Sequence, residues 1–143
     1  MKMRIGGVLL ILALSACSSV GPVPIRTGEI CFRCQRPIID TRLAAQTVSG
    51  LVSDFRTAGC LAKYLADHPG DKSAVFVTDY ETGKLIPAAS GVYVPTVNRD
   101  NGERDFVVYR RTANARVEAA ARQTSTMTWA QVLEQAKSAQ RGN

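Results

Sequence analysis

Three cysteines carry the chemistry that this sequence can support: Cys31 and Cys34, three positions apart, and Cys60 further along the chain. Two thiols at this spacing can bind one soft metal ion or oxidise to a disulfide, and a third thiol brought alongside favours the metal. Cu(I), which accepts two or three sulfur ligands, and Zn(II), which requires four ligands, are the candidate ions. The number of thiols favours Cu(I), with Zn(II) or no metal as the alternatives.

Cys60 is expected in the first turn of a helix that Thr57 caps and that ends at Pro69-Gly70. The unpaired amides and the positive end of the helix dipole would favour a thiolate at this position. The alternative is that Cys60 is buried and acts as a small hydrophobic residue, as free cysteines often do.

The segment around the paired cysteines is basic, with arginines at Arg26, Arg33, Arg36 and Arg42. Positive charge would lower the thiol pKa values and offset the negative charge of a site built from two or three thiolates. The alternative is a solvated basic segment with no role in the site. His68 is expected near a helix C-terminus, roughly 12 Å along the axis from Cys60, which is too far to share one ion with that sulfur.

The N-terminus has the features of an export signal. A basic start precedes an uncharged run, residues 5–14, which is too short for a membrane-spanning helix of about 20 residues. Leu14-Ser15-Ala16-Cys17 resembles a bacterial lipobox, so residues 1–16 are interpreted as a lipoprotein signal peptide and Cys17 as the lipidated first residue. The alternative is an ordinary secretory signal. Ser18 resembles the sorting position of outer-membrane lipoproteins, which predicts an envelope protein facing the periplasm.

The rest of the chain is predicted to form a lipid-anchored tether, residues 17–28, and one domain, residues 29–143. Removal of Lys2 and Arg4 lowers the formal net charge from +6 to +4, which suits an envelope protein near anionic lipid. No helix carries a basic stripe interleaved with aromatic residues, so a nucleic-acid partner is not expected. The sequence contains no glycine-rich phosphate loop, serine elbow or His-x-x-x-His pair, and it indicates no enzyme.

The patterning predicts an α+β fold of two similar β-β-α-β units and a C-terminal helix. The first unit has strands at 43–49, 51–55 and 74–78 around the Thr57-capped helix. The second has strands at 91–97, 104–109 and 124–127 around a helix that Thr112 caps and that ends near residue 123. Thr128 and Gln131 form a capping box for the last helix, residues 129–139. The paired thiols are expected on a loop before the first unit.

Several stretches fall in one order along the chain: the lipobox, Cys31-x-x-Cys34, Phe55-x-x-x-Gly59-Cys60-Leu61-x-x-Tyr64, Val77-Thr78-Asp79-Tyr80-Glu81-Thr82-Gly83, Gly91-Val92-Tyr93-Val94 and Thr128-Trp129-x-x-Val132-Leu133. In these the sequence resembles the NosL family, envelope lipoproteins that act as accessory copper chaperones for nitrous oxide reductase. The resemblance covers most of the chain after residue 16. It implies a pair of β-β-α-β units, Cu(I) binding, and a periplasmic cuproenzyme as the recipient.

The chain departs from the family pattern at two methionine positions. Gln35-Arg36 stands where the family commonly has Gly-Met, and Pro95-Thr96 stands where it has Pro-Met. The family's thioether ligands therefore do not carry over, and only Cys31, Cys34 and Cys60 remain as candidate copper ligands.

Two other functions are compatible with the same cysteines. One is a thiol-disulfide redox protein that uses Cys31 and Cys34, although no buried strand leads into this pair as in thioredoxin-like sites. The other is a structural lipoprotein with a Cys31 to Cys34 bridge. Covalent haem attachment is excluded, because Gln35 follows the second cysteine where a histidine is required.

Overall fold

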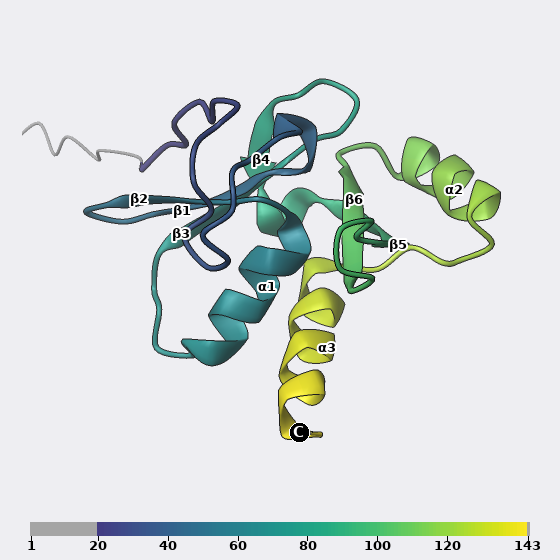
Figure 1. Cartoon of the computed structure of the whole chain (residues 1–143). Coiled ribbons are helices and arrows are strands. Elements are labelled where there is room, and N and C mark those ends of the chain that lie inside the picture. The colour runs from purple at the N-terminus through teal and green to yellow at the C-terminus, as the bar shows by residue number, and fades with distance from the viewer. Residues whose placement is uncertain (1–19, 143) are drawn as a thin grey trace, which may run out of the picture.

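Two antiparallel sheets and three α-helices make up residues 20–142, the part of the chain that this computed structural model describes (Figure 1). The predicted α+β class and the C-terminal helix are confirmed. The predicted signal peptide and the lipid site at Cys17 lie outside the described residues. Among residues 20–142, no helix is both long enough and apolar enough to span a membrane.

The first sheet contains β1 (Ala45–Val48), β2 (Val52–Phe55), β3 (Ala74–Thr78) and β4 (Leu85–Pro87), in the order β2-β1-β3-β4. Ala45 lies opposite Phe55 on one side and Val77 on the other. Helix α1 (Ala58–Asp67) follows β2 and leads to β3, as the sequence predicted for the first unit. Strand β4 and two short 3-10 turns, Thr41–Leu43 and Ala88–Ser90, were not predicted.

The second unit contains β5 (Val92–Val97), β6 (Arg104–Tyr109) and α2 (Thr112–Ala121). Its predicted third strand, residues 124–127, is reduced to one bridge between Met127 and Tyr93, with backbone bonds of 2.7 and 2.9 Å. Tyr93 also pairs with Val108, so β5 lies between β6 and Met127. The first unit has the same arrangement, with β1 between β2 and β3. The order of the unit is kept, but the strand stops because α3 begins two residues later.

The helix caps explain where two of the helices start. Thr57 accepts the amide of Cys60 at 3.1 Å, and Thr128 and Gln131 form the predicted capping box of α3 (Trp129–Arg141). For α2 the predicted cap was wrong. Arg111 is the extended residue before the helix and makes no side-chain capping bond, whereas Thr112 is already helical. The backbone angle, rather than the residue type, decided this position.

The main core lies where α1 packs against α3 and β6. Phe55, Leu61, Tyr93, Phe106 and Val132 are buried there, and Cys31 belongs to the same cluster. Figure 1 shows α1 and α3 running side by side, with α2 set apart on the far side of β5 and β6. A smaller cluster beneath α2 includes Val94, Val107 and Ala115.

The predicted tether is attached to the first sheet over part of its length. The backbone N–H of Val23 donates to Gln46 Oε1 at 2.8 Å, and Gln46 Nε2 donates to the backbone oxygen of Val23 at 2.9 Å. Gly28 donates to the backbone oxygen of Ile38 at 2.8 Å. Contacts with the folded domain therefore begin at Val23, before the predicted domain start at residue 29.

Candidate metal centre

Cys31 and Cys34 lie on a closed loop, as predicted. A bridge between Ile30 and Pro37 closes the loop, and the amide of Cys31 donates to the backbone oxygen of Arg36 at 2.9 Å. Gln35 makes the tight return possible with a φ of 58°, an uncommon left-handed conformation for a residue other than glycine.

Two contacts hold this loop against the first sheet. The amide of Phe32 donates to the backbone oxygen of Asp54 in β2 at 2.7 Å. The Phe32 ring packs edge-on against Phe55 and Tyr64, with ring centroids 6.1 and 5.6 Å apart. The loop is thereby fixed beside the end of β2, where the chain turns into α1 and carries Cys60.

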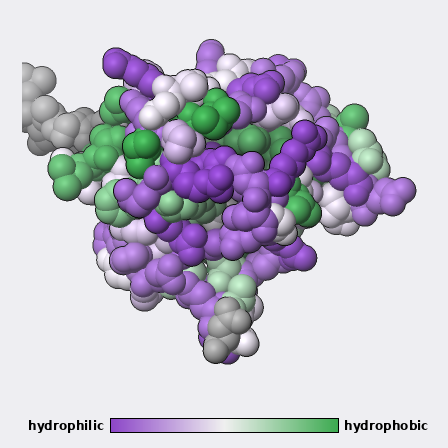
Figure 2. Space-filling model, in the orientation of Figure 1, coloured by the Kyte–Doolittle hydropathy of each residue, from purple (hydrophilic) through white to green (hydrophobic). Residues whose placement is uncertain are grey.

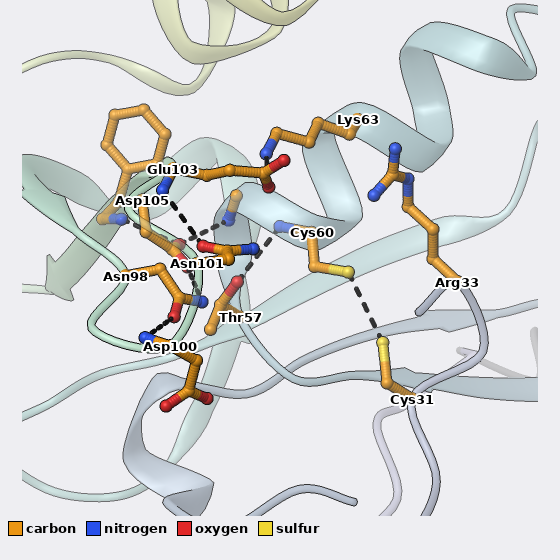
Figure 3. A network of polar contacts seen from close by, with 12 residues as sticks. Cys31, Arg33, Thr57, Cys60, Lys63, Asn98, Asp100, Asn101, Glu103 and Asp105 are labelled. Carbon is orange, nitrogen blue, oxygen red and sulfur yellow. Dashed lines mark hydrogen bonds and ion pairs between the residues drawn. The ribbon is translucent and has the colours of Figure 1, made fainter. Parts of the chain in front are cut away.

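Cys60 sits in the first turn of α1, at the position that the Thr57 cap predicted. The start of the helix is held from the second unit, because Asp105 Oδ1 in β6 accepts the amide of Gly59 at 3.0 Å. Thr57 bonds the same carboxylate through its side chain. Figure 3 shows this network and the Cys60 sulfur directed toward Cys31.

The three sulfur atoms form one cluster. All lie within 4.8 Å of one another, and the sulfurs of Cys31 and Cys60 are 3.5 Å apart. None is in a disulfide, which would require a separation of about 2.05 Å. Three sulfurs around one ion at metal–sulfur distances of about 2.3 Å would be roughly 4 Å apart, so the spacing suits a shared ion. Within residues 20–142, no histidine or carboxylate joins this group.

Contacts among the thiols shift the pKa values of Cys31 and Cys60 in opposite directions. Hydrogen bonds from Cys60, then from the amides of Cys34 and Arg56 and from the Cys34 thiol, lower the pKa of Cys31 well below that of an ordinary thiol despite burial. The pKa of Cys60 is raised, because its thiol bonds the Cys31 sulfur, is desolvated, and faces the negative charge there. In the metal-free cluster the lowered pKa is thus that of Cys31, whereas the sequence predicted the lowered pKa at Cys60.

The reason is local. The Gly59 and Cys60 amides, which would have stabilised an anion at the helix start, are already bonded to Asp105 and Thr57. The buried Asp105 carboxyl group accepts the Gly59 amide, which the sequence pattern suggested would have no hydrogen-bond partner. Burial raises the pKa of this carboxyl group, against the effect of its hydrogen bonds.

A small pocket of about 60 Å³ leads from solvent to Cys34 and Cys60. Four basic side chains line it: Arg33, Arg36, Arg56 and Lys63. Arg56 ion-pairs with Asp100, and its pKa is raised by this bond and by the nearby charge of Cys34 and Cys31. Lys63 ion-pairs with Glu103. The basic side chains are accompanied by the acidic residues Glu103 and Asp105, which line the same pocket.

The residues that supply the positive charge of the pocket are only partly the predicted ones. Arg33 and Arg36 reach the pocket, but Arg42 pairs with Asp40 at 3.1 Å and lies 4.6 Å from the centre of the Tyr80 ring. Arg26 does not line the pocket either. Arg56 and Lys63 were not predicted as part of the site, although the spacing of Lys63, one helical turn after Cys60, places the two side chains on the same face of the helix.

His68 lies at the C-terminal end of α1, as expected, and takes no part in the cluster. Its ring stacks on Tyr64, with centroids 4.2 Å apart, and its Nδ1 is 2.8 Å from the backbone oxygen of Tyr64. The residue closes the helix and covers an aromatic ring.

No family model, no curated protein and no solved structure matches this chain. The resemblance to the NosL family therefore stays a prediction. The geometry of the site itself indicates its chemistry, because three thiols this close together can hold one metal ion.

Proposed function

We propose that this protein is a lipid-anchored envelope protein that binds one Cu(I) through Cys31, Cys34 and Cys60 and delivers it to a periplasmic cuproenzyme such as nitrous oxide reductase. The observation that carries the proposal is the mutual approach of three sulfurs to within 4.8 Å without a disulfide. Soft thiolates select Cu(I), and three of them complete its coordination.

The ligand number favours Cu(I) over Zn(II). Zn(II) in a structural site takes four protein ligands. Within residues 20–142, no histidine or carboxylate lies close enough to the three sulfurs to serve as a fourth ligand. The cluster is also open on one side. Cys31 is buried, whereas Cys34 and Cys60 are partly exposed and line the basic pocket. A donor atom of a recipient protein can reach the ion from this pocket, as ligand exchange requires.

A Cu(I) competition titration against a chromophoric chelator tests the site. The reduced wild-type protein should bind one equivalent. Cys31→Ser, Cys34→Ser and Cys60→Ser should each weaken binding by at least about tenfold, because even the loss of a residue that supports a ligand costs about 10–100-fold. Ser53→Ala, away from the cluster, is the matched control and should bind like the wild type. If only Cys31→Ser and Cys34→Ser lose affinity, Cys60 is a core residue and no ligand.

A redox function is the second candidate, because the sulfurs of Cys31 and Cys60 lie only 3.5 Å apart. Mild oxidation followed by peptide mapping would identify which pair closes. A wild-type protein that binds no Cu(I) but cycles a disulfide with a thiol donor would overturn the copper site. The pair predicted from the sequence, Cys31 with Cys34, and the closer pair, Cys31 with Cys60, give different cross-linked peptides.

Delivery to nitrous oxide reductase is supported by the sequence resemblance alone and needs its own test. The copper-loaded protein should transfer Cu(I) to the metal-free reductase, and the colour of the reductase's copper centre should return. Free Cu(I) held by the same chelator is the control. Loading that is no faster from the protein than from the chelator would reject delivery while leaving the metal site intact.

A further inference from the structure

The loop between β1 and β2 is apolar and unusually exposed. Leu51 is 80% exposed and Val52 is 44% exposed. The whole stretch from residue 43 to residue 53 is uncharged, although 21% of the chain is charged. Figure 2 shows hydrophobic surface at this end of the molecule, beside the grey atoms.

Residues near the start of the described part of the chain contribute further exposed apolar side chains to this end of the molecule. Val20 and Val23 are 53% and 47% exposed, and residues 18–25 are also uncharged. Val23 is fixed to Gln46 of β1 by two hydrogen bonds. Figure 1 shows the purple start of the chain and the β1–β2 loop on one side of the molecule. We call the four exposed side chains Val20, Val23, Leu51 and Val52 the apolar tip.

Chain length places this tip near a membrane. If Cys17 carries the lipid, six peptide steps separate it from Val23, and a fully extended chain covers at most about 20 Å over that length. Because Val23 is bonded to β1, the tether cannot hold the first sheet further from the lipid surface than this. Because residues 18–25 and 43–53 carry no charged side chain, these two stretches can approach a bilayer without desolvating an ion of their own.

We propose that the apolar tip inserts into the bilayer that holds the lipid anchor and so fixes the orientation of the domain. The four apolar side chains would contact the interfacial region of the lipid bilayer. The inference rests on the lipid anchor of the proposed function. It is independent of the metal.

The orientation has a consequence for the cysteine cluster. Leu51 and Val52 of the tip lie at the start of β2, whereas Thr57 and Cys60 follow the end of that strand. Four strand residues separate the two ends by roughly 13 Å. With the tip in the bilayer, the basic pocket at Cys34 and Cys60 points into the aqueous phase, where a soluble recipient can reach it.

Tryptophan fluorescence tests the insertion in the full-length lipidated protein. Leu51→Trp, reconstituted in phosphatidylethanolamine and phosphatidylglycerol vesicles with brominated acyl chains, should show blue-shifted emission that loses most of its intensity relative to unbrominated vesicles. Val52→Trp is a second reporter. Val117→Trp, on the exposed face of α2, is the matched control and should keep its emission; Val117 is 71% exposed. Trp129 contributes equally to all variants.

Each outcome decides the inference. Quenching of Leu51→Trp or Val52→Trp without quenching of Val117→Trp supports it. Unquenched emission at both tip positions, or equal quenching at all three, overturns it while recovery with the vesicles still supports the anchor. A protein that does not enter the membrane fraction at all overturns the anchor, and the tip insertion with it.

Discussion

Cys31 is the fully buried member of the thiol cluster, and its surroundings decide how the site handles protons. In the metal-free protein the contact between the two sulfurs lowers the pKa of Cys31 and raises the pKa of Cys60. The pKa of Cys60 is raised first by its hydrogen bond to the Cys31 sulfur, then by burial, and then by the nearby negative charge of Cys31 and Cys34. A bound metal ion offsets the repulsion between ionised sulfurs because it places a positive charge between them.

Copper binding should therefore release the proton of Cys60. Its raised pKa keeps Cys60 protonated at neutral pH, so Cu(I) and the proton compete for that sulfur, and the affinity should fall as the pH falls. Titration calorimetry in two buffers with different ionisation enthalpies measures the protons released. Cys60→Ser is the control and should release fewer protons. Equal heats in both buffers and an affinity independent of pH would contradict this.

Gly59 occupies a position where no side chain fits. A Cβ atom there would lie 2.6 Å from Asp105 Oδ1 and 3.3 Å from the backbone oxygen of Arg104. The contact closes the gap between α1 and β6, so the start of the helix and the cysteine it carries are set by the second unit.

Gly59→Ala should destabilise the protein by about 1–3 kcal/mol, the usual cost of overpacking, and weaken Cu(I) binding by displacing Cys60. The gain in helix propensity on replacing glycine, about 1 kcal/mol, offsets only part of this. Urea unfolding and the copper titration measure the two effects. Gly70→Ala, where an added Cβ meets nothing within 4 Å, is the control and should change neither. A Gly59→Ala protein as stable as the Gly70→Ala protein would show that the contact relaxes freely.

At the scale of elements, the turn after β3 joins the two units. Tyr80 donates its amide to the backbone oxygen of Val108 in β6 at 2.8 Å. The buried carboxylate of Asp79 accepts the amide of Arg110 at 3.0 Å and the hydroxyl of Thr82 at 2.7 Å. The turn at Asp79 and Tyr80 thus connects the first sheet to β6 through hydrogen bonds.

Asp79→Asn should lower the free energy of unfolding by about 1–3 kcal/mol near neutral pH. Burial alone would raise the pKa of Asp79, but hydrogen bonds from Thr82 and from nearby backbone amides lower it overall. A carboxyl group with a lowered folded-state pKa adds stability above its ordinary pKa of 3.8, and this stability is lost as the pH falls through the folded value.

The difference between wild type and Asp79→Asn should therefore shrink below about pH 4. Urea unfolding across the acid range measures it. Glu134→Gln, on the exposed face of α3, is the control and should stay within about 0.5 kcal/mol of wild type. A difference that stays constant down to pH 2 would show that the ionised form of Asp79 is not what the turn requires.

At the scale of the whole molecule, the cluster draws on three parts of the chain: the loop at Cys31 and Cys34, the start of α1 at Cys60, and the Asp105 carboxylate of β6 behind it. No single unit holds all of these. The second unit therefore helps to fix the helix start that carries Cys60, and metal binding should stabilise the complete fold.

Cys17→Ser should move the protein from the membrane fraction to the soluble envelope fraction. Several acyl chains, at about 0.8 kcal/mol per buried methylene, anchor a lipoprotein, and the substitution removes their attachment site. Fractionation of cells followed by immunoblotting measures the shift, and Ser19→Ala is a matched control that should remain in the membrane. Equal membrane recovery of Cys17→Ser and the parent would contradict lipidation at this residue.

The sequence by itself determined features that depend on a few neighbouring residues. Thr57 and Thr128 predicted two helix starts because capping involves residues three positions apart, and short apolar runs predicted three of the strands of the first sheet, β1, β2 and β3. The third thiol at Cys60 favoured a metal site over a disulfide, and the structure brings all three sulfurs together.

Tertiary structure alone decided the properties that depend on residues far apart in the chain. Asp105 reaches the first turn of α1 from 46 positions away, so the sequence could not show that the amides beside Cys60 were already bonded. The proton preference of the cluster follows from the 3.5 Å approach of Cys31 and Cys60 across 29 positions. Electrostatic and hydrogen-bonding energies depend on separation in space, and only the packing of the two units sets those separations.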